Sequence, residues 1–294
     1  MTCGRQFPVE DNIPNLLLDR EPRVEAVRKF YEAAPFPGYP PNDSLSWLRT
    51  RAERSPFVQL LDQSIPGDAR IVEIGCGTGQ MSLYLARADR IVVGADLTRA
   101  SLKLGAAAAR RFELDRALFV ETDLGRPGLK EGSFDIVYAA GVLHHLPDPR
   151  AGFARIARLA RPGGKIIIGL YNRYARVPLC LRRLVARMTN YRFIPFDPVL
   201  SDRAAEPERR LAWLRDQYQH PEEHRHTLRE VMRWFAENDV RYLRCYPSAM
   251  IGDDAQDLFA PPEDNWQFEG LLSQIGWMGT IGKEGGLFMA IGEC

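Results

Sequence analysis

The residues best suited to bind a ligand lie in one glycine-rich segment, Glu73-x-Gly75-x-Gly77-x-Gly79. Glycines allow the backbone to turn sharply and to lie directly against a ligand. Their spacing differs from the Gly-x-Gly-x-x-Gly of dinucleotide sites. Residues 72–85 contain no Lys or Arg that could neutralise a phosphate, and the Glu73 carboxylate would repel one. The segment therefore favours a ligand that carries a cationic amino group.

Two further acids come later in the chain, and each directly follows a short apolar run. Asp96 stands 21 residues after Gly75, at the place where an acid accepts hydrogen bonds from ribose hydroxyls. Asp123 follows the next run, where a carboxylate can accept a hydrogen bond from an adenine amino group. Each acid alone could be a helix cap or a surface turn residue. Three acids at three successive strand ends, all on one edge of a sheet, indicate a shared site.

The elements that position these acids alternate short apolar runs with helical patterns, which is typical of a parallel sheet with crossover helices. The predicted strands are residues 70–75, 90–95, 117–122, 134–139 and 165–170. The helical patterns between them lie near residues 80–88, 99–113 and 149–160. A predicted turn at residues 161–164 leads into the fifth strand. Right-handed crossovers then give a doubly wound α/β sheet with helices on both faces.

Two segments lie outside this alternation, residues 1–66 and residues 171–226. Their helical patterns lie near residues 22–33, 44–64, 177–189 and 204–218. The later elements of the core are a helix and two strands, at residues 227–237, 241–246 and 286–292. We predict one seven-stranded core formed by residues 67–170 and 227–294. An N-terminal helical cap (1–66) and a helical cap inserted after the fifth strand (171–226) complete the prediction.

The motifs of the core resemble those of class I S-adenosylmethionine-dependent methyltransferases. The matching motifs are the glycine-rich segment, Asp96, Asp123 and the runs 134–146 and 159–164. The resemblance covers residues 67–170 and, more loosely, residues 227–294. It implies a Rossmann-like methyltransferase fold and an enzyme that uses S-adenosyl-L-methionine and releases S-adenosyl-L-homocysteine. The Leu-His-His-Leu run at residues 143–146 is similar to that of small-molecule methyltransferases of quinone biosynthesis.

The resemblance also implies a set of cofactor-binding residues. These are Glu73, Gly75, Gly77, Gly79, Asp96, Leu97, Asp123, Leu124 and Gly141. In such proteins the first glycines contact the methionine part of the cofactor, the acid of the second strand binds ribose, and the residues after the third strand flank adenine. Two aromatic residues of the N-terminal cap, Tyr31 and Tyr39, either close over the cofactor or pack on the core.

The expected acceptor site lies beyond the fourth and fifth strands. His144 and His145 are the candidate catalytic residues, because a general base there would take a proton from the acceptor. The alternative is that both histidines are structural, since methyl transfer from a sulfonium mainly needs in-line alignment. The candidate acceptor-binding residues are Tyr171, Asn172, Tyr174, His220 and His224. The His and Glu cluster at residues 220–226 lacks a recognised metal-ligand spacing, so no metal is expected.

An arginine-rich helical pattern within the inserted segment leaves three interpretations open. Residues 171–192 contain six arginines and no acid, and their apolar residues recur at helical spacing. The helix could cover an anionic substrate, lie on a membrane surface, or pair with acids elsewhere. Six acids without any Lys or Arg within residues 251–270 offer such partners.

Composition narrows the function classes. The chain of 294 residues has 39 Lys and Arg against 38 Asp and Glu, a formal net charge of +1, which disfavours a broad nucleic-acid interface. The five scattered cysteines form no Cys-x-x-Cys pair. Neither a membrane span nor a secretory leader is predicted. We therefore expect a cytoplasmic monomer or homodimer that methylates a small molecule. The alternatives are an RNA methyltransferase and a catalytically inactive, cofactor-binding regulatory protein.

Overall fold

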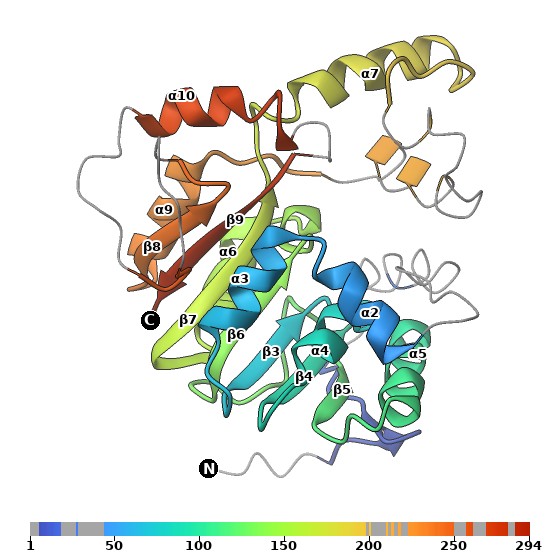
Figure 1. Cartoon of the computed structure of the whole chain (residues 1–294), viewed down its shortest axis with the longest axis vertical. Helices are drawn as coiled ribbons and strands as arrows, with labels where there is room; N and C mark the ends of the chain where they lie inside the picture. The colour runs from blue at the N-terminus through green and yellow to red at the C-terminus, as the bar shows by residue number, and fades with distance from the viewer. Residues whose placement is uncertain are drawn as a thin grey trace.

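The computed structural model describes residues 6–18, 28, 44–197, 200, 210, 213–214, 217–218, 223–249, 257–260, 269–281 and 286–294. A seven-stranded sheet with the order β5-β4-β3-β6-β7-β9-β8 runs through these residues (Figure 1). Its strands are β3 (Arg70–Ile74), β4 (Ile91–Asp96), β5 (Ala117–Glu121), β6 (Phe134–Ala140), β7 (Ala160–Tyr171), β8 (Arg241–Tyr246) and β9 (Leu287–Glu293).

The sheet is parallel from β5 to β7, and β9 runs antiparallel between β7 and β8. Val72 of β3 lies in register between Val93 and Val137 of its two neighbours. The strand order reverses at β3, because β4 and β5 lie on one side of it and β6 and β7 on the other. In open α/β sheets, ligands bind at the carboxyl ends of the strands beside such a switch point. The fold class predicted from the sequence is confirmed.

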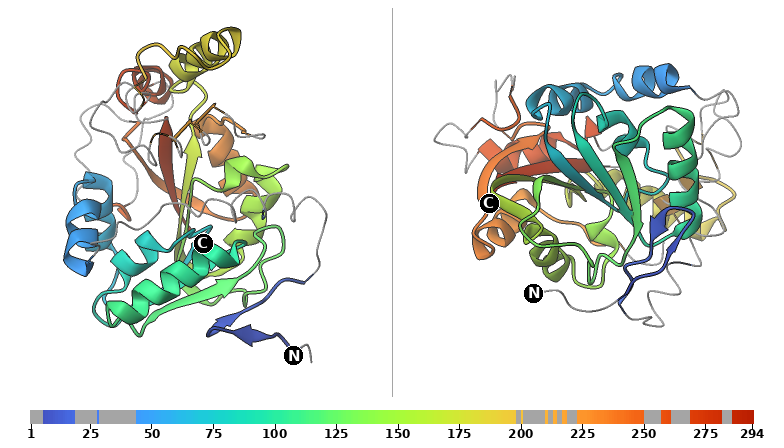
Figure 2. Two further views of the ribbon diagram at one scale, coloured as in Figure 1. Left: turned by 90° about the vertical axis from the view of Figure 1, so that its right-hand side faces the viewer. Right: turned by 90° about the horizontal axis from the view of Figure 1, so that it is seen from below.

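Hydrophobic side chains fill two cores, one on each face of the sheet. Successive residues of a strand point to opposite faces, so Ile71 belongs to one core and Val72 to the other. The covering helices are α3 (Pro56–Ser64), α4 (Gln80–Leu85), α5 (Arg99–Arg111), α6 (Pro149–Ala157) and α9 (Leu228–Glu237). α6 and α9 pack on the Val72 face, where the rings of Phe153 and Phe235 stack 5.1 Å apart. The other three helices pack on the Ile71 face (Figure 2).

Phe119 of β5 lies where three glycines from three segments make room for its ring. A Cβ added to Gly79, to Gly94 of β4 or to Gly105 of α5 would come closer than 3 Å to that ring. A glycine inside a helix costs about 1 kcal/mol relative to alanine. At Gly105 that cost allows α5 to approach the sheet with the phenyl ring between them.

The N-terminal segment differs from the helical cap predicted for residues 1–66. Its first described elements are two strands, β1 (Val9–Glu10) and β2 (Ile13–Pro14), which pair as a hairpin. Asn15 then bridges to Glu121, so this hairpin extends along the β5 edge of the sheet. The predicted helix at residues 44–64 is two helices, α2 (Leu45–Ala52) and α3, because Pro56 begins a new helix. Of the pattern at residues 22–33, only Arg28 is described.

The turn predicted at residues 161–164 lies inside β7, which begins at Ala160. Ala160 pairs with Phe134, the register shifts between Phe134 and Ile136, and Gly163 has a φ of 74°. The bend that the sequence indicated is therefore an irregularity within the strand. The other strands of the core match the predictions to within about one residue.

The inserted segment contains α7 (Val177–Met188), which confirms the helix predicted at residues 177–189. Most of the pattern at residues 204–218 lies outside the described residues. A further helix, α10 (Glu269–Gly276), precedes β9 and was not predicted. α7 and α10 lie at the same end of the molecule in both orientations (Figures 1 and 2). Among the described residues, no helix has both the length and the apolar composition needed to cross a bilayer.

Candidate active site

The glycine-rich turn joins β3 to α4 at the carboxyl edge of the sheet. Gly75, Gly77 and Gly79 all have positive φ angles, of 69°, 53° and 76°, which side chains with a Cβ rarely adopt. A Cβ on Gly75 would also collide with the side chain of Val142, which follows β6. The turn therefore lies directly against the end of the neighbouring strand, and glycine is required at that contact.

Asp96, the last residue of β4, holds this turn in place. One oxygen of its carboxylate accepts the N–H of Gly77 at 2.8 Å, and the other accepts the N–H of Thr98 at 2.7 Å. Burial raises the pKa of Asp96, and these backbone hydrogen bonds oppose that rise. A carboxylate offers about four acceptor positions, and the backbone amides of Gly77 and Thr98 take two of them. The Thr98 side chain and the Leu97 backbone also contribute hydrogen bonds that lower the pKa of Asp96.

Glu73 is a second acid beside the turn, and it is almost fully buried, with 7% of its surface exposed. Its carboxylate accepts a hydrogen bond from the Ser82 hydroxyl of α4. Burial raises the pKa of Glu73 to about 7, although the hydrogen bond from Ser82 opposes the rise. Near neutral pH the carboxyl group is therefore close to its midpoint, and a positive charge nearby would favour its ionised form.

The rest of the predicted cofactor residues lie along the same edge. Asp123 follows β5, is half-buried, and accepts the N–H of Gly125 at 2.8 Å. Leu97 is half-buried and Leu124 is buried. Gly141, with a φ of 77°, follows β6, and a Cβ built there meets no atom within 4 Å. Open space therefore adjoins Gly141, next to the end of a strand that neighbours β3.

The two histidines of the short helix η1 (Leu143–His145) differ in their surroundings. His144 is fully buried, and its ring lies 3.9 Å from the ring of Tyr171 and 4.3 Å from that of His145. His145 is only partly buried. The geometry favours a packing role for His144 and leaves His145 as the histidine that can meet an acceptor.

Arg176 forms a buried network that the sequence did not reveal. Its guanidinium lies 3.6 Å from the ring centroid of Tyr171 and donates to Gln217 at 2.9 Å and to Glu223 at 2.5 Å. Arg183 donates to the same carboxylate at 2.5 and 3.1 Å. Burial alone would raise the pKa of Glu223, but the two arginines lower it. The network ties the inserted segment to the end of β7.

Of the remaining predicted acceptor residues, Asn172 and Tyr174 follow β7, and His224 follows Glu223 of the network. Asn172 is fully buried, accepts the N–H of Tyr174 at 3.0 Å, and donates to Gln274 at 3.0 Å. These bonds give it a role in ordering the turn before α7. Tyr174 and His224 are half-buried, and the N–H of His224 donates to the carbonyl of His144 at 2.8 Å. Three predicted residues lie outside the described part of the chain: Tyr31, Tyr39 and His220.

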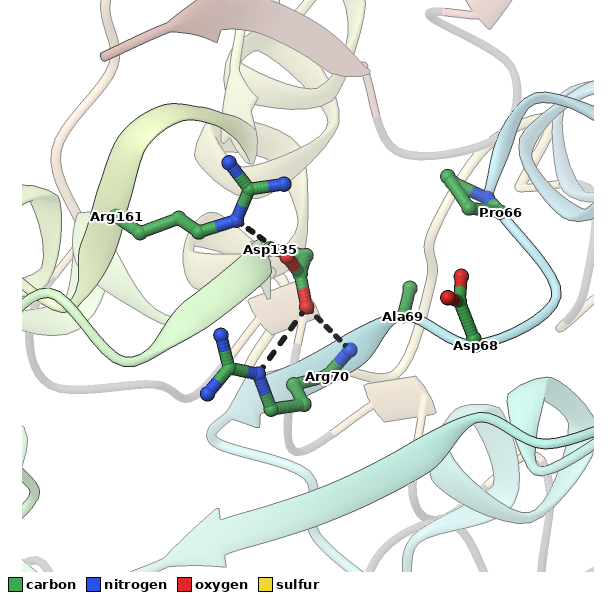
Figure 3. Close-up of a pocket in the computed structure, with 6 residues that line it drawn as sticks. All are labelled: Pro66, Asp68, Ala69, Arg70, Asp135 and Arg161. Carbon is green, nitrogen blue, oxygen red and sulfur yellow. Dashed lines mark hydrogen bonds and ion pairs between the residues drawn. The ribbon is translucent and has the colours of Figure 1, made fainter.

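A hollow of about 270 Å³ lies at the opposite, amino-terminal edge of the sheet (Figure 3). There Asp135 accepts the backbone N–H of Arg70 at 2.7 Å and a hydrogen bond from the Arg161 guanidinium. Asp135 thus pairs with both arginines, and the hollow lies at the edge opposite the glycine-rich turn. Among the described residues, no three His, Cys, Asp or Glu side chains are grouped so that they could hold a metal ion.

Comparisons with known proteins agree with this geometry. Residues 72–168 match a family described as "Methyltransferase domain". An uncharacterised protein of Synechococcus sp. is 28% identical over 279 residues, which cover 80% of this chain and 65% of that protein. The ubiquinone biosynthesis O-methyltransferase of Alkalilimnicola ehrlichii is 34% identical over 104 residues, 35% of this chain and 42% of that protein. The chain thus spans less than two thirds of either relative.

A solved structure confirms the fold over nearly the whole chain. The geranyl diphosphate C-methyltransferase of Streptomyces coelicolor, in complex with Mg²⁺, geranyl diphosphate and S-adenosyl-L-homocysteine, has a TM-score of 0.52 to this chain. The two are 15% identical, and the match covers 94% of this chain and 99% of the other.

Proposed function

We propose that this chain, whose residues 72–168 match the methyltransferase-domain family, is a class I S-adenosylmethionine-dependent methyltransferase that transfers a methyl group to a small-molecule acceptor. The observation that carries the proposal is the placement of Glu73, Asp96 and Asp123. These acids lie at or beside the ends of three adjacent parallel strands, next to the glycine-rich turn and the open space at Gly141.

Each part of the cofactor has a matching group in this arrangement. Asp96 would accept the ribose hydroxyls, because its carboxylate is already oriented by two backbone amides. Asp123 and Leu124 would flank adenine, and the glycine-rich turn would lie against the methionine part. The buried Glu73 carboxylate would balance the ammonium group, directly or through a water molecule. S-adenosyl-L-methionine, when bound, supplies an electrophilic methyl group on its sulfonium.

The acceptor would lie between the Gly141 end of β6 and the inserted segment. In-line transfer requires the acceptor atom to present a lone pair to the methyl group, and a hydroxyl or amine then loses a proton. His145 would accept that proton, while the neighbouring rings of His144 and Tyr171 hold its imidazole in position. Tyr174 and His224 would complete the wall of the acceptor site.

The similarity to ubiquinone biosynthesis O-methyltransferases supports a small acceptor, although it covers only the core of the chain. The acids of the site argue against a phosphate-rich nucleic acid, since three carboxylates would repel its backbone. A protein that only binds the cofactor would keep the same acids, so the choice between an enzyme and a regulatory protein depends on turnover.

Calorimetric titration tests the cofactor half of this proposal. S-adenosyl-L-methionine and S-adenosyl-L-homocysteine should both bind with micromolar affinity, and NAD should bind far more weakly. Tight NAD binding without any binding of S-adenosyl-L-methionine would refute the assignment.

Single-turnover transfer of a labelled methyl group tests the acceptor half, with phenols, catechols, amines and transfer RNA as acceptors. On the acceptor used best, His145→Gln should slow transfer by about 10²- to 10⁴-fold without changing cofactor affinity. Tyr174→Phe should impair transfer in the same selective way. Methylation of RNA alone would contradict a small-molecule acceptor. Equal losses of cofactor affinity and of methyl transfer would instead assign His145 and Tyr174 to the cofactor site.

A further inference from the structure

α7 exposes a continuous apolar face to solvent. Leu181, Leu184 and Met188 are 62%, 58% and 78% exposed, and Val177 is exposed as well. Their spacing of three and four residues places all four on one side of the helix. The opposite side is anchored by the buried Leu179 and Ala186. Contiguous exposed apolar surface of this kind marks an interaction site.

Exposed apolar residues also follow the end of the helix. Phe193 and Phe196 follow α7 and are 60% and 91% exposed. α10, a separate helix at the same end of the molecule (Figures 1 and 2), exposes Leu271, Leu272 and Ile275. The apolar face of α7 and the two phenylalanines together exceed the single scattered apolar residues that any soluble protein shows.

The charged residues of α7 and of the segment that follows it, up to residue 196, are all arginines. Residues 171–196 contain six arginines and no acid. Three of these arginines form ion pairs with Glu223 or Glu230: Arg173, Arg176 and Arg183. Arg187 and Arg192 are exposed and form no ion pair with any residue that the structure describes. The acid-rich stretch 251–270, expected above as a possible partner, lies mostly outside the described residues.

We propose that residues 177–196 bind the surface of membranes that carry anionic headgroups. A helix of 12 residues is about 18 Å long and cannot cross a hydrocarbon layer of about 30 Å. A helix with an apolar face and flanking arginines instead lies in the plane of the interface. Anionic lipid complements Arg187 and Arg192, whereas the same basic face on a second copy of this chain would repel them. The proposal does not depend on methyl transfer.

Flotation of the full-length protein with lipid vesicles tests this proposal. The protein should float with vesicles of phosphatidylcholine and phosphatidylglycerol at a ratio of 7:3, and about tenfold less with phosphatidylcholine alone. Met188→Glu should reduce flotation by tenfold or more, and its high exposure should leave folding intact. Leu104→Glu is the matched control, because Leu104 is also exposed, at 43%, but belongs to α5, which lies at the opposite end of the molecule from α7 (Figures 1 and 2). Arg187→Gln with Arg192→Gln should lower binding to the anionic vesicles alone.

Other results would overturn the proposal. Equal binding to both vesicle types would remove the role of charge, and equal losses in the Met188 and Leu104 variants would remove the role of α7. Light scattering in the absence of lipid tests the alternative, in which a second copy of this chain packs on the apolar face of α7. A dimer that Met188→Glu converts to a monomer, with no vesicle binding by the wild type, would identify the surface as a contact between two copies.

Discussion

Replacing Glu73 with glutamine should change how the stability of the protein depends on pH. The pKa of Glu73 is raised from its ordinary value of 4.5 to about 7, because the carboxyl group is buried. Below pH 4.5 the group is protonated in both the folded and the unfolded chain, and its burial carries no charge penalty. Between pH 4.5 and 7 the unfolded chain loses this proton while the folded chain retains it, so stability falls as the pH rises.

The size of the effect follows from the two pKa values. The difference between 4.5 and about 7 corresponds to about 3 kcal/mol at about 1.4 kcal/mol per pH unit. Glutamine has nearly the same shape, and its amide oxygen can still accept the Ser82 hydroxyl, but it cannot ionise. The Glu73→Gln variant should therefore equal the wild type near pH 4 and exceed it by about 3 kcal/mol at pH 8.

Urea unfolding of both proteins at pH 4.5, 6, 7 and 8 measures this difference directly, because all other titrating groups are shared. A difference that stays constant across the series would refute the raised pKa. Cofactor binding provides a second measurement. An ammonium group bound near Glu73 would favour the ionised carboxylate, so that binding at pH 6 would release the proton of Glu73 into solution. Titration of the wild type in two buffers of different ionisation enthalpy detects that proton, and the Gln variant should release none.

Three further changes test the rest of the site. Asp96→Ala should weaken S-adenosyl-L-methionine binding by about 1–3 kcal/mol in calorimetry, and more than Asp123→Ala; the reverse order would exchange the two assignments. Gly75→Ala should lower the free energy of unfolding by about 2 kcal/mol or more, because the positive φ and the facing valine both disfavour a Cβ; an unchanged urea midpoint would contradict the collision. Arg176→Met should cost about 3 kcal/mol of stability, whereas the exposed Arg187→Met should cost less than about 0.5 kcal/mol; similar losses would mean that the buried network contributes little.

The sheet and its cofactor edge were predictable because their signals are local. Continuous apolar runs identified the buried parallel strands, and the acids at the strand ends lie within a few residues of those runs. Asp96 and Gly77 are 19 residues apart, and the crossover between two adjacent strands is what brings them together. Sequence order alone therefore placed them on one edge.

Other features depend on contacts between distant segments. Arg176 pairs with Glu223, 47 residues later in the chain, and nothing nearby in the sequence distinguishes this buried arginine from the exposed Arg187. The strands β1 and β2 have two residues each, too few for any periodic pattern, and they depend on the edge of the sheet beside β5. His144 and His145 are neighbours of the same type, and only the packing of Tyr171 separates the buried one from the partly exposed one.

The ring of Phe119 makes three distant positions dependent on a single residue. Any side chain introduced at Gly79, Gly94 or Gly105 would occupy volume that the ring already fills. Such a change first requires a smaller residue 119, so the order in which substitutions arrive influences which sequences an evolving lineage can reach. At Gly105 the backbone oxygen of Thr78 must also move, and at Gly94 the hydroxyl of Ser82. A mutant library that varies the three glycines with Phe119 held constant would consist mainly of variants in which an added Cβ collides with the ring. A library that varies all four together would include combinations in which a methyl group on one segment replaces part of the ring on another.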